Sequence, residues 1–118
     1  MDQLIYKVLS EPQWDAAVRC GEFTGSAVDR RDGYIHFSTA GQVVETVRKH
    51  FAGQDHLLLL SVSAEELGTD LKWEPSRGGD LFPHLYGPLP VSAVIAAVPL
   101  PRDPSGGHCF PSHLAGDG

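Results

Sequence analysis

The sequence predicts a single α+β domain with two main helices. Three observations lead to this prediction. Short runs rich in β-branched and other apolar residues, typical of strands, alternate with two segments that have apolar residues at helical spacing. The connections between these elements are irregular, and a regular doubly wound sheet would need more helices. A length of 118 residues suits one domain with its own core.

The first strand and the first helix are predicted at the N-terminus. Residues 4–9 (LIYKVL) are rich in residues that favour strands. Ser10 then suits the N-cap of a helix, and Gln13 three positions later completes a capping box. We expect Gly21 to end this helix, because glycine readily adopts the left-handed conformation of a C-cap.

A short strand and a second helix follow. Residues 33–38 (GYIHFS) are predicted as a strand, opened by the turn dipeptide at positions 32 and 33. Thr39 is predicted to cap the second helix, with Gln42 three positions later and Gly53 at its end. The residues between them place apolar side chains along one face of that helix.

Three further strands are predicted in the second half of the chain, at residues 56–63, 70–74 and 91–99. The strand at 56–63 is expected to be buried on both faces. The run at 91–99 is almost continuously apolar, so we expect it to be a central strand. The globular domain is predicted to span residues 1–98. Residues 99–118 are rich in proline and glycine, and we expect them to form a flexible C-terminal tail.

Composition and charge argue against several functions. The chain carries nine basic and fifteen acidic residues, a net charge of -6, which argues against general nucleic-acid binding. The longest apolar runs, at 57–60 and 93–98, are too short to cross a bilayer, and the N-terminus lacks the features of a signal peptide. Two cysteines, Cys20 and Cys109, do not make a disulfide scaffold, so we expect a cytoplasmic protein without membrane contact.

The stretch GYIHFSTAGQ (33–42) carries the first group of candidate site residues. Alternation along a strand would place Tyr34, His36 and Ser38 on one face, while the apolar residues between them point into the core. One of Ser38 and Thr39 is expected to cap the following helix, which leaves the other hydroxyl free to bind a ligand. Because a helix N-terminus attracts anions, this polar face predicts a binding site.

The stretch WEPSRGGDLFPHLYGPLP (73–90) carries the second group. Its two adjacent glycines allow a ligand to approach the backbone closely, and its prolines stiffen the path of the chain. A loop that holds a fixed shape loses less binding energy to ordering. The candidate side chains in this stretch are Trp73, Glu74, Arg77, His84 and Tyr86.

A nucleotide-type ligand fits these residue types best. Arg77 offers a guanidinium for phosphate, and Tyr86 or Trp73 offers a face on which a planar ring stacks. His36 and Ser38 offer hydrogen bonds to ribose hydroxyls. No GxGxxG or Walker sequence is present, so neither a Rossmann nor a P-loop site is predicted.

Two other functions stay open. In the first, the chain is a non-enzymatic interaction module, and the 77–90 loop presents Phe82, Leu85 and Tyr86 to a protein partner as one exposed apolar patch. The second is a metal-dependent hydrolase, but its ligands would come from separate segments without a signature spacing, so no metal site is predicted. Those ligands would be His36, His84 and Glu74.

Both stretches resemble the motifs of a bacterial domain family of unknown function, G-[FY]-I-H-x-S-T-A-x-Q and W-E-x-x-R-G-G-x-x-F-P-H-L-Y-G. The likeness extends from about Tyr6 to Val98. That family is distantly similar to the ADP-ribosyltransferase-like fold. The resemblance therefore implies a bent or split mixed sheet with a cleft for NAD or a related nucleotide. It also implies that His36 and Ser38 bind the nicotinamide ribose and that Tyr86 stacks on nicotinamide.

The chain departs from the transferase pattern at one point. ADP-ribosyltransferases usually place a catalytic glutamate on a late strand, whereas residues 91–98 contain no acidic residue. Glu74 and His84 are the candidate polar catalysts from elsewhere in the chain. Whether the chain is an enzyme stays open at this point, and the reaction class that the resemblance implies is ribosyl transfer or hydrolysis at the ribose C1 carbon.

Overall fold

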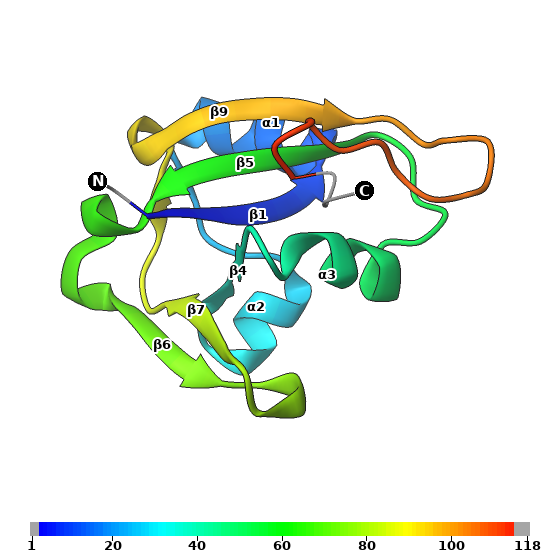
Figure 1. The fold of residues 1–118 in the computed structure, drawn as a ribbon. Helices are drawn as coiled ribbons and strands as arrows, with labels where there is room; N and C mark the ends of the chain where they lie inside the picture. Colours follow the sequence, from blue (N-terminus) through cyan, green and yellow to red (C-terminus); the bar gives the residue numbers. More distant parts are fainter. Residues whose placement is uncertain (1–2, 115–118) are drawn as a thin grey trace.

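A four-stranded antiparallel sheet forms the centre of the fold (Figure 1). The computed structural model describes residues 3–114, without the side chain of Arg77. In spatial order, the strands of this sheet are β4 (Ser38–Thr39), β1 (Leu4–Ser10), β5 (Leu57–Ser63) and β9 (Val94–Leu100). The two central strands, β1 and β5, pair with each other along their full length.

The other strands form two smaller sheets. One has the spatial order β3 (Ile35–His36), β7 (Leu81–Leu85) and β6 (Leu71–Pro75), and β6 and β7 lie at the end of the molecule away from β9 (Figure 1). The other pairs β2 (Glu22–Phe23) with β8 (Leu89–Pro90). Every pairing within the described part of the chain is antiparallel, so the strands form several antiparallel sheets and not the mixed sheet that was predicted.

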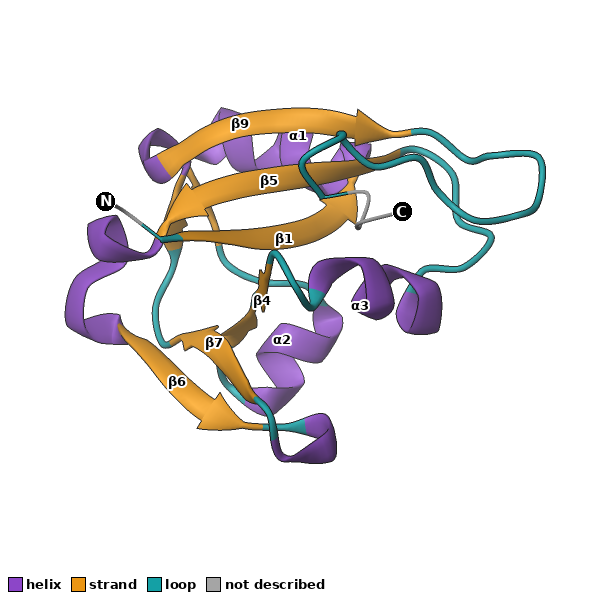
Figure 2. Ribbon diagram, viewed as in Figure 1, coloured by secondary structure: helices purple, strands orange, loops and turns teal. Residues whose placement is uncertain are grey.

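Within residues 3–114, three α-helices accompany these strands: α1 (Glu11–Cys20), α2 (Ala27–Asp32) and α3 (Val43–His50). The shorter 3₁₀ segments are η1 (Ala64–Asp70), η2 (Arg77–Gly79) and η3 (Val91–Ala93). Figure 2 shows α1 behind the large sheet and α3 on the side of β1. The α+β prediction is confirmed, and α2 adds a helix to the two predicted ones. No helix within residues 3–114 is both long enough and apolar enough to cross a membrane.

The two central strands of the large sheet, β1 and β5, are buried on both faces. Alternate residues of β1 point to opposite faces, so Ile5 and Leu9 join one core cluster while Tyr6 and Val8 join the other. The first cluster also contains apolar residues of α1, β3 and β7, and the second contains those of α3. The core therefore holds the three-stranded sheet against the α1 face of the large sheet.

The predicted first strand and first helix are confirmed. The Gln13 backbone N–H donates to the Ser10 hydroxyl, and the Ser10 N–H donates to the Gln13 side chain, as in a capping box. Gly21 ends α1 in the left-handed conformation, with φ of 89°. These interactions join residues close in sequence, and local sequence therefore specifies them.

The predicted strand at residues 33–38 is interrupted at Phe37. The Phe37 N–H donates to the carbonyl oxygen of Pro83, and the two halves of the predicted strand become β3 and β4 in different sheets. Tyr34, His36 and Ser38 therefore do not share one strand face, because His36 belongs to β3 and Ser38 to β4.

The second predicted helix begins later than the sequence indicated. Helix α3 starts at Val43 and ends at His50, and no side chain caps its N-terminus. The Thr39 N–H instead donates to the side-chain oxygen of Gln42, at 3.0 Å, in a turn that precedes the helix. This turn connects β4 to α3. The hydrogen bond between Thr39 and Gln42 therefore forms before the first residue of the helix.

Strand β9 is an edge strand, whereas the sequence predicted a central one. Residues 91–93 form η3, and among the described strands β9 pairs with β5 alone. Burial alternates along β9, and Ile95 is 61% exposed. An apolar run by itself does not distinguish a central strand from an edge strand, because the partners on either side come from distant parts of the chain.

The segment after β9 lies against the domain as far as residue 114. The predicted domain boundary at residue 98 falls inside β9, which ends at Leu100. Phe110 and the buried Leu114 pack into the core cluster on the α3 face of the large sheet. The last part of the predicted tail, residues 115–118, lies outside the described residues.

We expect buried and exposed aliphatic side chains of the large sheet to differ in their effect on stability. Leu60 is fully buried in β5, so Leu60→Ala should lower the free energy of unfolding by about 2–5 kcal/mol. Ile95→Ala at the exposed edge should lower it by less than about 1 kcal/mol. Denaturant unfolding of the three proteins measures both changes, and equal losses would contradict the edge position of β9.

Candidate functional site

The pairing of β3 with β7 brings the two sequence stretches together. Ile35 lies opposite Leu85, and His36 lies opposite His84. Directly opposed residues of an antiparallel pair share one face. Ile35 and Leu85 both enter the core, and the two imidazoles face the other way. The ring centroids of His36 and His84 are 5.5 Å apart, in an edge-on arrangement.

Two tyrosines join these histidines in what we call the ring cluster, which consists of Tyr34, His36, His84 and Tyr86. Tyr34 stacks on His84, with centroids 4.1 Å apart and ring planes at 25°. The Tyr34 ring also lies 4.7 Å from His36 and 5.2 Å from Tyr86. His84 is 3% exposed and Tyr86 is 39% exposed, so the tyrosines form the accessible surface and His84 lies beneath them.

Glu74 of β6 binds two members of the ring cluster through one oxygen. Its Oε1 lies 2.8 Å from Nδ1 of His84 and accepts a hydrogen bond, also of 2.8 Å, from the Tyr86 hydroxyl. The hydrogen bonds from His84 and then Tyr86 lower the pKa of Glu74, and the bond to Glu74 raises the pKa of Tyr86. Glu74 is therefore ionised at neutral pH, and neither bond uses its Oε2.

Asp29 of α2 is a buried carboxylate that connects α2 to β1 and β3. Its Oδ1 lies 2.6 Å from Nδ1 of His36 and accepts the His36 backbone N–H at 3.1 Å. Its Oδ2 lies 3.0 Å from the Nζ of Lys7 and accepts the Ser26 backbone N–H at 2.9 Å. Burial by itself would raise the pKa of Asp29, but these contacts hold the pKa well below its ordinary value.

His36 lies between two carboxylates. Its Nδ1 faces Asp29, and its Nε2 lies 3.0 Å from Oδ2 of Asp32, at the end of α2. Both ring nitrogens of His36 therefore lie within hydrogen-bonding distance of a carboxylate oxygen. Both nitrogens of His36 are thus engaged within the protein, and a ribose hydroxyl would have to displace Asp32 to reach Nε2.

The structure brings four of the predicted site residues together and places the others elsewhere. The four that meet are His36, Glu74, His84 and Tyr86. Ser38 is buried in β4, and its hydroxyl lies 3.1 Å from that of Thr46 in α3. The expected shared face of His36 and Ser38 does not form, because the chain passes from one sheet to another between them.

Three further predicted residues, Trp73, Thr39 and Arg77, lie at other places in the fold. Trp73 precedes Glu74 in β6, so alternation turns its side chain to the opposite face of the three-stranded sheet. Thr39 takes part in the turn before α3 through its backbone N–H. Arg77 belongs to η2, at the tip of the hairpin between β6 and β7, and its side chain is outside the described part of the structure.

Two observations bear on the alternative functions. Phe82 and Leu85 are 9% and 2% exposed, so they do not join Tyr86 in the outward apolar patch that an interaction loop would present. Among residues 3–114, no group of three or more His, Cys, Asp or Glu side chains is arranged to hold a metal ion.

Lys7, Asp29 and Asp32 are residues of the site that were not predicted from the sequence. A signal for Asp29 was present, because Ser26 and Asp29 have the spacing of a capping box, and that capping box forms at the start of α2. Lys7 lies in an otherwise apolar strand, and a buried ammonium group requires a partner. Asp32 was interpreted only as part of a turn.

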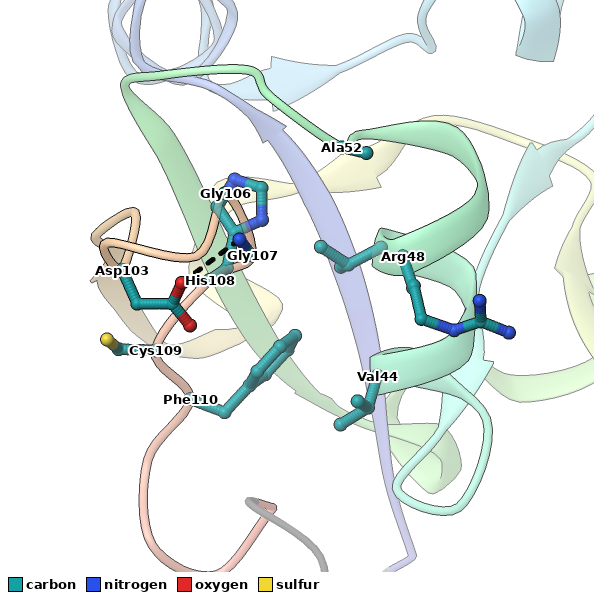
Figure 3. A pocket seen from close by; sticks show the side chains of 10 residues that line it. Val44, Arg48, Ala52, Asp103, Gly106, Gly107, His108, Cys109 and Phe110 are labelled. Atoms are coloured by element: carbon teal, nitrogen blue, oxygen red, sulfur yellow. Dashed lines mark hydrogen bonds between the residues drawn. The ribbon is translucent and has the colours of Figure 1, made fainter.

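A hollow of about 280 Å³ opens next to the ring cluster, between α2 and the end of β7. Its lining consists of Thr24, Asp29, Arg30, Gly33, Tyr34, Ile35, Leu85 and Gly87. A larger and mainly apolar hollow of about 600 Å³ lies between α3 and residues 103–110 (Figure 3). The larger hollow contains none of the predicted site residues, so we place the candidate site at the ring cluster.

Comparison with known proteins gives a family. A family model described as a protein of unknown function (DUF952) matches residues 8–97. The chain belongs to this family. The range matched by the DUF952 model contains the whole ring cluster together with Glu74 and Asp29.

The DUF952 chain is also similar to solved structures of the bacterial protein CC0527 from Caulobacter crescentus. A crystal structure of CC0527 is 55% identical, with a TM-score of 0.91 over 95% of this chain and 98% of that chain. A solution NMR structure of CC0527 is likewise 55% identical, with a TM-score of 0.85 over 95% and 97% of the two chains. No curated protein matches the sequence.

Removing the charge of Asp29 should destabilise the protein in a pH-dependent way. At neutral pH, Asp29→Asn should cost about 3–5 kcal/mol, because the buried Lys7 ammonium loses its carboxylate. The pKa of Asp29 is depressed in the folded state, so its contribution is complete above the ordinary carboxyl pKa and is lost as the pH falls towards the folded-state pKa. The difference in stability between wild type and variant should therefore begin to shrink only below about pH 4 and disappear as the pH approaches the folded-state pKa, as measured by denaturant unfolding across pH.

The matched control is Glu45→Gln, which removes a carboxylate from an exposed pair with Arg48 on α3. This variant should leave the stability nearly unchanged at neutral pH. A loss in Asp29→Asn that stays the same from neutral to acidic pH would show that the carboxylate charge is not the source of the stabilisation.

Proposed function

We propose that the ring cluster and Glu74 form a binding site for a nucleotide-type ligand, with NAD as the first dinucleotide to test. One observation carries this proposal. Residues from two distant stretches of the chain meet through the pairing of His36 with His84, and the tyrosines beside them remain accessible. A cluster of rings that opens to solvent next to an ionised carboxylate combines a stacking surface with a hydrogen-bond acceptor.

The tyrosines supply the stacking surface for a base or a nicotinamide ring. Tyr86 is 39% exposed, and its ring lies 5.2 Å from that of Tyr34. Tyr34 stacks on His84, and the Tyr86 hydroxyl binds Glu74, so both rings are held in place before a ligand arrives. A ring that is already ordered loses little entropy on binding.

Partly exposed carboxylates supply acceptors for the ribose. The side chains of Glu74 and Asp32 are 35% and 30% exposed. In our proposal the ribose hydroxyls donate to these carboxylates, an interaction that dinucleotide sites use. This assignment replaces the ribose contacts that the resemblance implied for His36 and Ser38. His36 instead orients Asp32 through Nε2.

We further propose an ADP-ribosyltransferase-like arrangement, with chemistry at the ribose C1 carbon. Glu74 supports this proposal, because an ionised carboxylate stabilises the positive charge that develops at C1 as the bond to the base breaks. In hydrolysis, a water oxygen bonds to C1, the base departs with the electron pair of the broken bond, and the proton lost by the water is released to bulk solvent. His84 is buried, so we assign it a positioning role on Glu74.

We also infer a cytoplasmic location. Cys20 and Cys109 are both free and exposed. Thiols persist in this form in a reducing compartment.

Nucleotide binding is tested by titrating the protein with NAD, ADP-ribose and AMP while recording backbone amide spectra. We expect shifts at Tyr34, His36, Glu74 and Tyr86. Tyr86→Ala should weaken binding by about 10–100-fold, because the stacking surface is lost. Trp73→Ala removes an equally exposed aromatic ring from the opposite face of the sheet and should leave the affinity unchanged. Unshifted spectra at millimolar nucleotide would refute the proposed site.

The ribose contact is tested with Glu74→Gln, which keeps the size of the side chain and removes its charge. Adenosine should lose about tenfold in affinity, since a hydrogen bond to a charged group is replaced by a neutral one, while free adenine should be unaffected. The same variant should stop any release of nicotinamide from NAD, followed by chromatography. An equal loss for adenine and adenosine would show that Glu74 acts on the stacking surface and not on the ribose.

A further inference from the structure

The hollow beside Tyr34 is not used by the function proposed above. Tyr34 lines the hollow and also belongs to the ring cluster, so a ligand that stacks on the tyrosines extends naturally into it. Arg30 and Thr24 lie on its α2 side, and the Leu85 and Gly87 segment lies on the other. A volume of about 280 Å³ is large enough for a phosphate group with part of a sugar.

We propose that this hollow binds the phosphate group of a nucleotide whose base stacks on the ring cluster, with Arg30 as the cationic contact. The inference rests on the proposed function and adds the place where the phosphate of that nucleotide binds. It also assigns a binding role to Arg30, for which the sequence analysis gave no signal.

The distribution of charge around the ring cluster supports this assignment. Asp32 and Glu74 border the rings, so a phosphate placed beside the rings would be repelled by two carboxylates. Asp29 also lines the hollow, but the buried Lys7 ammonium offsets its charge, and its two oxygens already contact Lys7, Ser26 and His36. A cation that binds the phosphate must therefore lie away from Asp32 and Glu74.

Arg30 meets this requirement. Its Nη2 donates to the Thr24 hydroxyl at 2.8 Å, which holds the guanidinium at the rim of the hollow. Within residues 3–114, Arg30 forms no ion pair with a carboxylate, whereas the neighbouring Arg31 pairs with Asp32 at 3.1 Å. A guanidinium has five N–H donors in a planar fork, so four remain for phosphate oxygens after the bond to Thr24.

Gly33 leaves room for the ligand beside Arg30. It ends α2 with φ of 91°, a conformation that favours glycine. A Cβ built at this position would meet no atom within 4 Å, so the absence of a side chain keeps this wall of the hollow open.

The hollow and Arg77 lie at opposite ends of β7. Arg77 precedes β7 in the hairpin turn, at the end where Pro75 pairs with Leu81. The hollow lies at the other end, beside Leu85 and Gly87. The phosphate contact that the sequence analysis gave to Arg77 therefore passes, in this proposal, to Arg30.

The experiment compares adenosine with AMP by calorimetric titration. We expect the wild type to bind AMP at least tenfold more tightly than adenosine, with the difference decreasing as salt is added. Arg30→Gln should abolish the preference for AMP and leave adenosine binding unchanged. Arg30→Lys keeps the charge and should retain part of the preference, which shows that a loss in Arg30→Gln does not come from misfolding.

The matched control is Arg19→Gln, which removes one exposed positive charge from α1 and should keep the full preference for AMP. Three outcomes would overturn the inference. Equal affinity of the wild type for adenosine and AMP refutes the phosphate contact alone and leaves the nucleoside site standing. An equal loss of both ligands in Arg30→Gln also refutes it. Binding of neither ligand by the wild type refutes the proposed function together with the inference.

A separate titration with inorganic phosphate distinguishes a nucleotide phosphate from a free anion. We expect inorganic phosphate alone to shift the amides around Arg30 only at concentrations far above those needed for AMP, because the stacked base supplies much of the affinity. Shifts of Arg30, Gly33 and Tyr34 at the same concentration as AMP would identify an independent anion site and contradict the link to a nucleotide.

Discussion

The buried carboxylate of Asp29 is the interaction on which the rest of the site depends. A carboxylate removed from water costs much free energy unless charged and polar donors compensate for it. Here the donors are the Lys7 ammonium, the ring and backbone of His36, and the Ser26 backbone N–H. These donors belong to β1, β3 and the start of α2, so forming them fixes three elements relative to one another. Once β3 is in place, its pairing with β7 positions His84 against His36.

The site uses the same pair of groups twice, for different purposes. His36 faces Asp29 through Nδ1, and His84 faces Glu74 through the same ring atom. Asp29 is buried, and both of its carboxylate oxygens have partners within the protein, so the pair of His36 and Asp29 stabilises the fold. Glu74 is partly exposed, and it contacts the ring cluster through Oε1 alone. The pair of His84 and Glu74 therefore has a carboxylate at the protein surface. Because packing and hydrogen bonds fix the rings, the site is ordered without a ligand.

Features set by neighbours in sequence were predictable, and features set by distant partners were not. The capping box of Ser10 and Gln13 needs only four residues, and it formed as expected. The sequence also indicated His36, His84 and Tyr86 as one site, because rigid stretches carried them. It did not reveal the break at Phe37, which depends on a hydrogen bond to Pro83. The same limit applies to Asp29, whose donors come from other elements.

The exposed position of β6 at the rim of its sheet affects how this protein meets other chains. The Tyr86 N–H donates to the carbonyl oxygen of Asp70, and the Ser76 N–H donates to that of Asp80. The backbone N–H and C=O groups of the even-numbered residues of β6 therefore point towards β7, and those of the odd-numbered residues point outwards. Pro75 has no N–H, and the Leu71 N–H is used by Gly68. Within β6, only Trp73 presents an amide donor at that rim. An added strand would meet outward carbonyl oxygens but a single free amide donor there, so it would form fewer backbone hydrogen bonds than at an edge with all its donors free, which limits sheet extension.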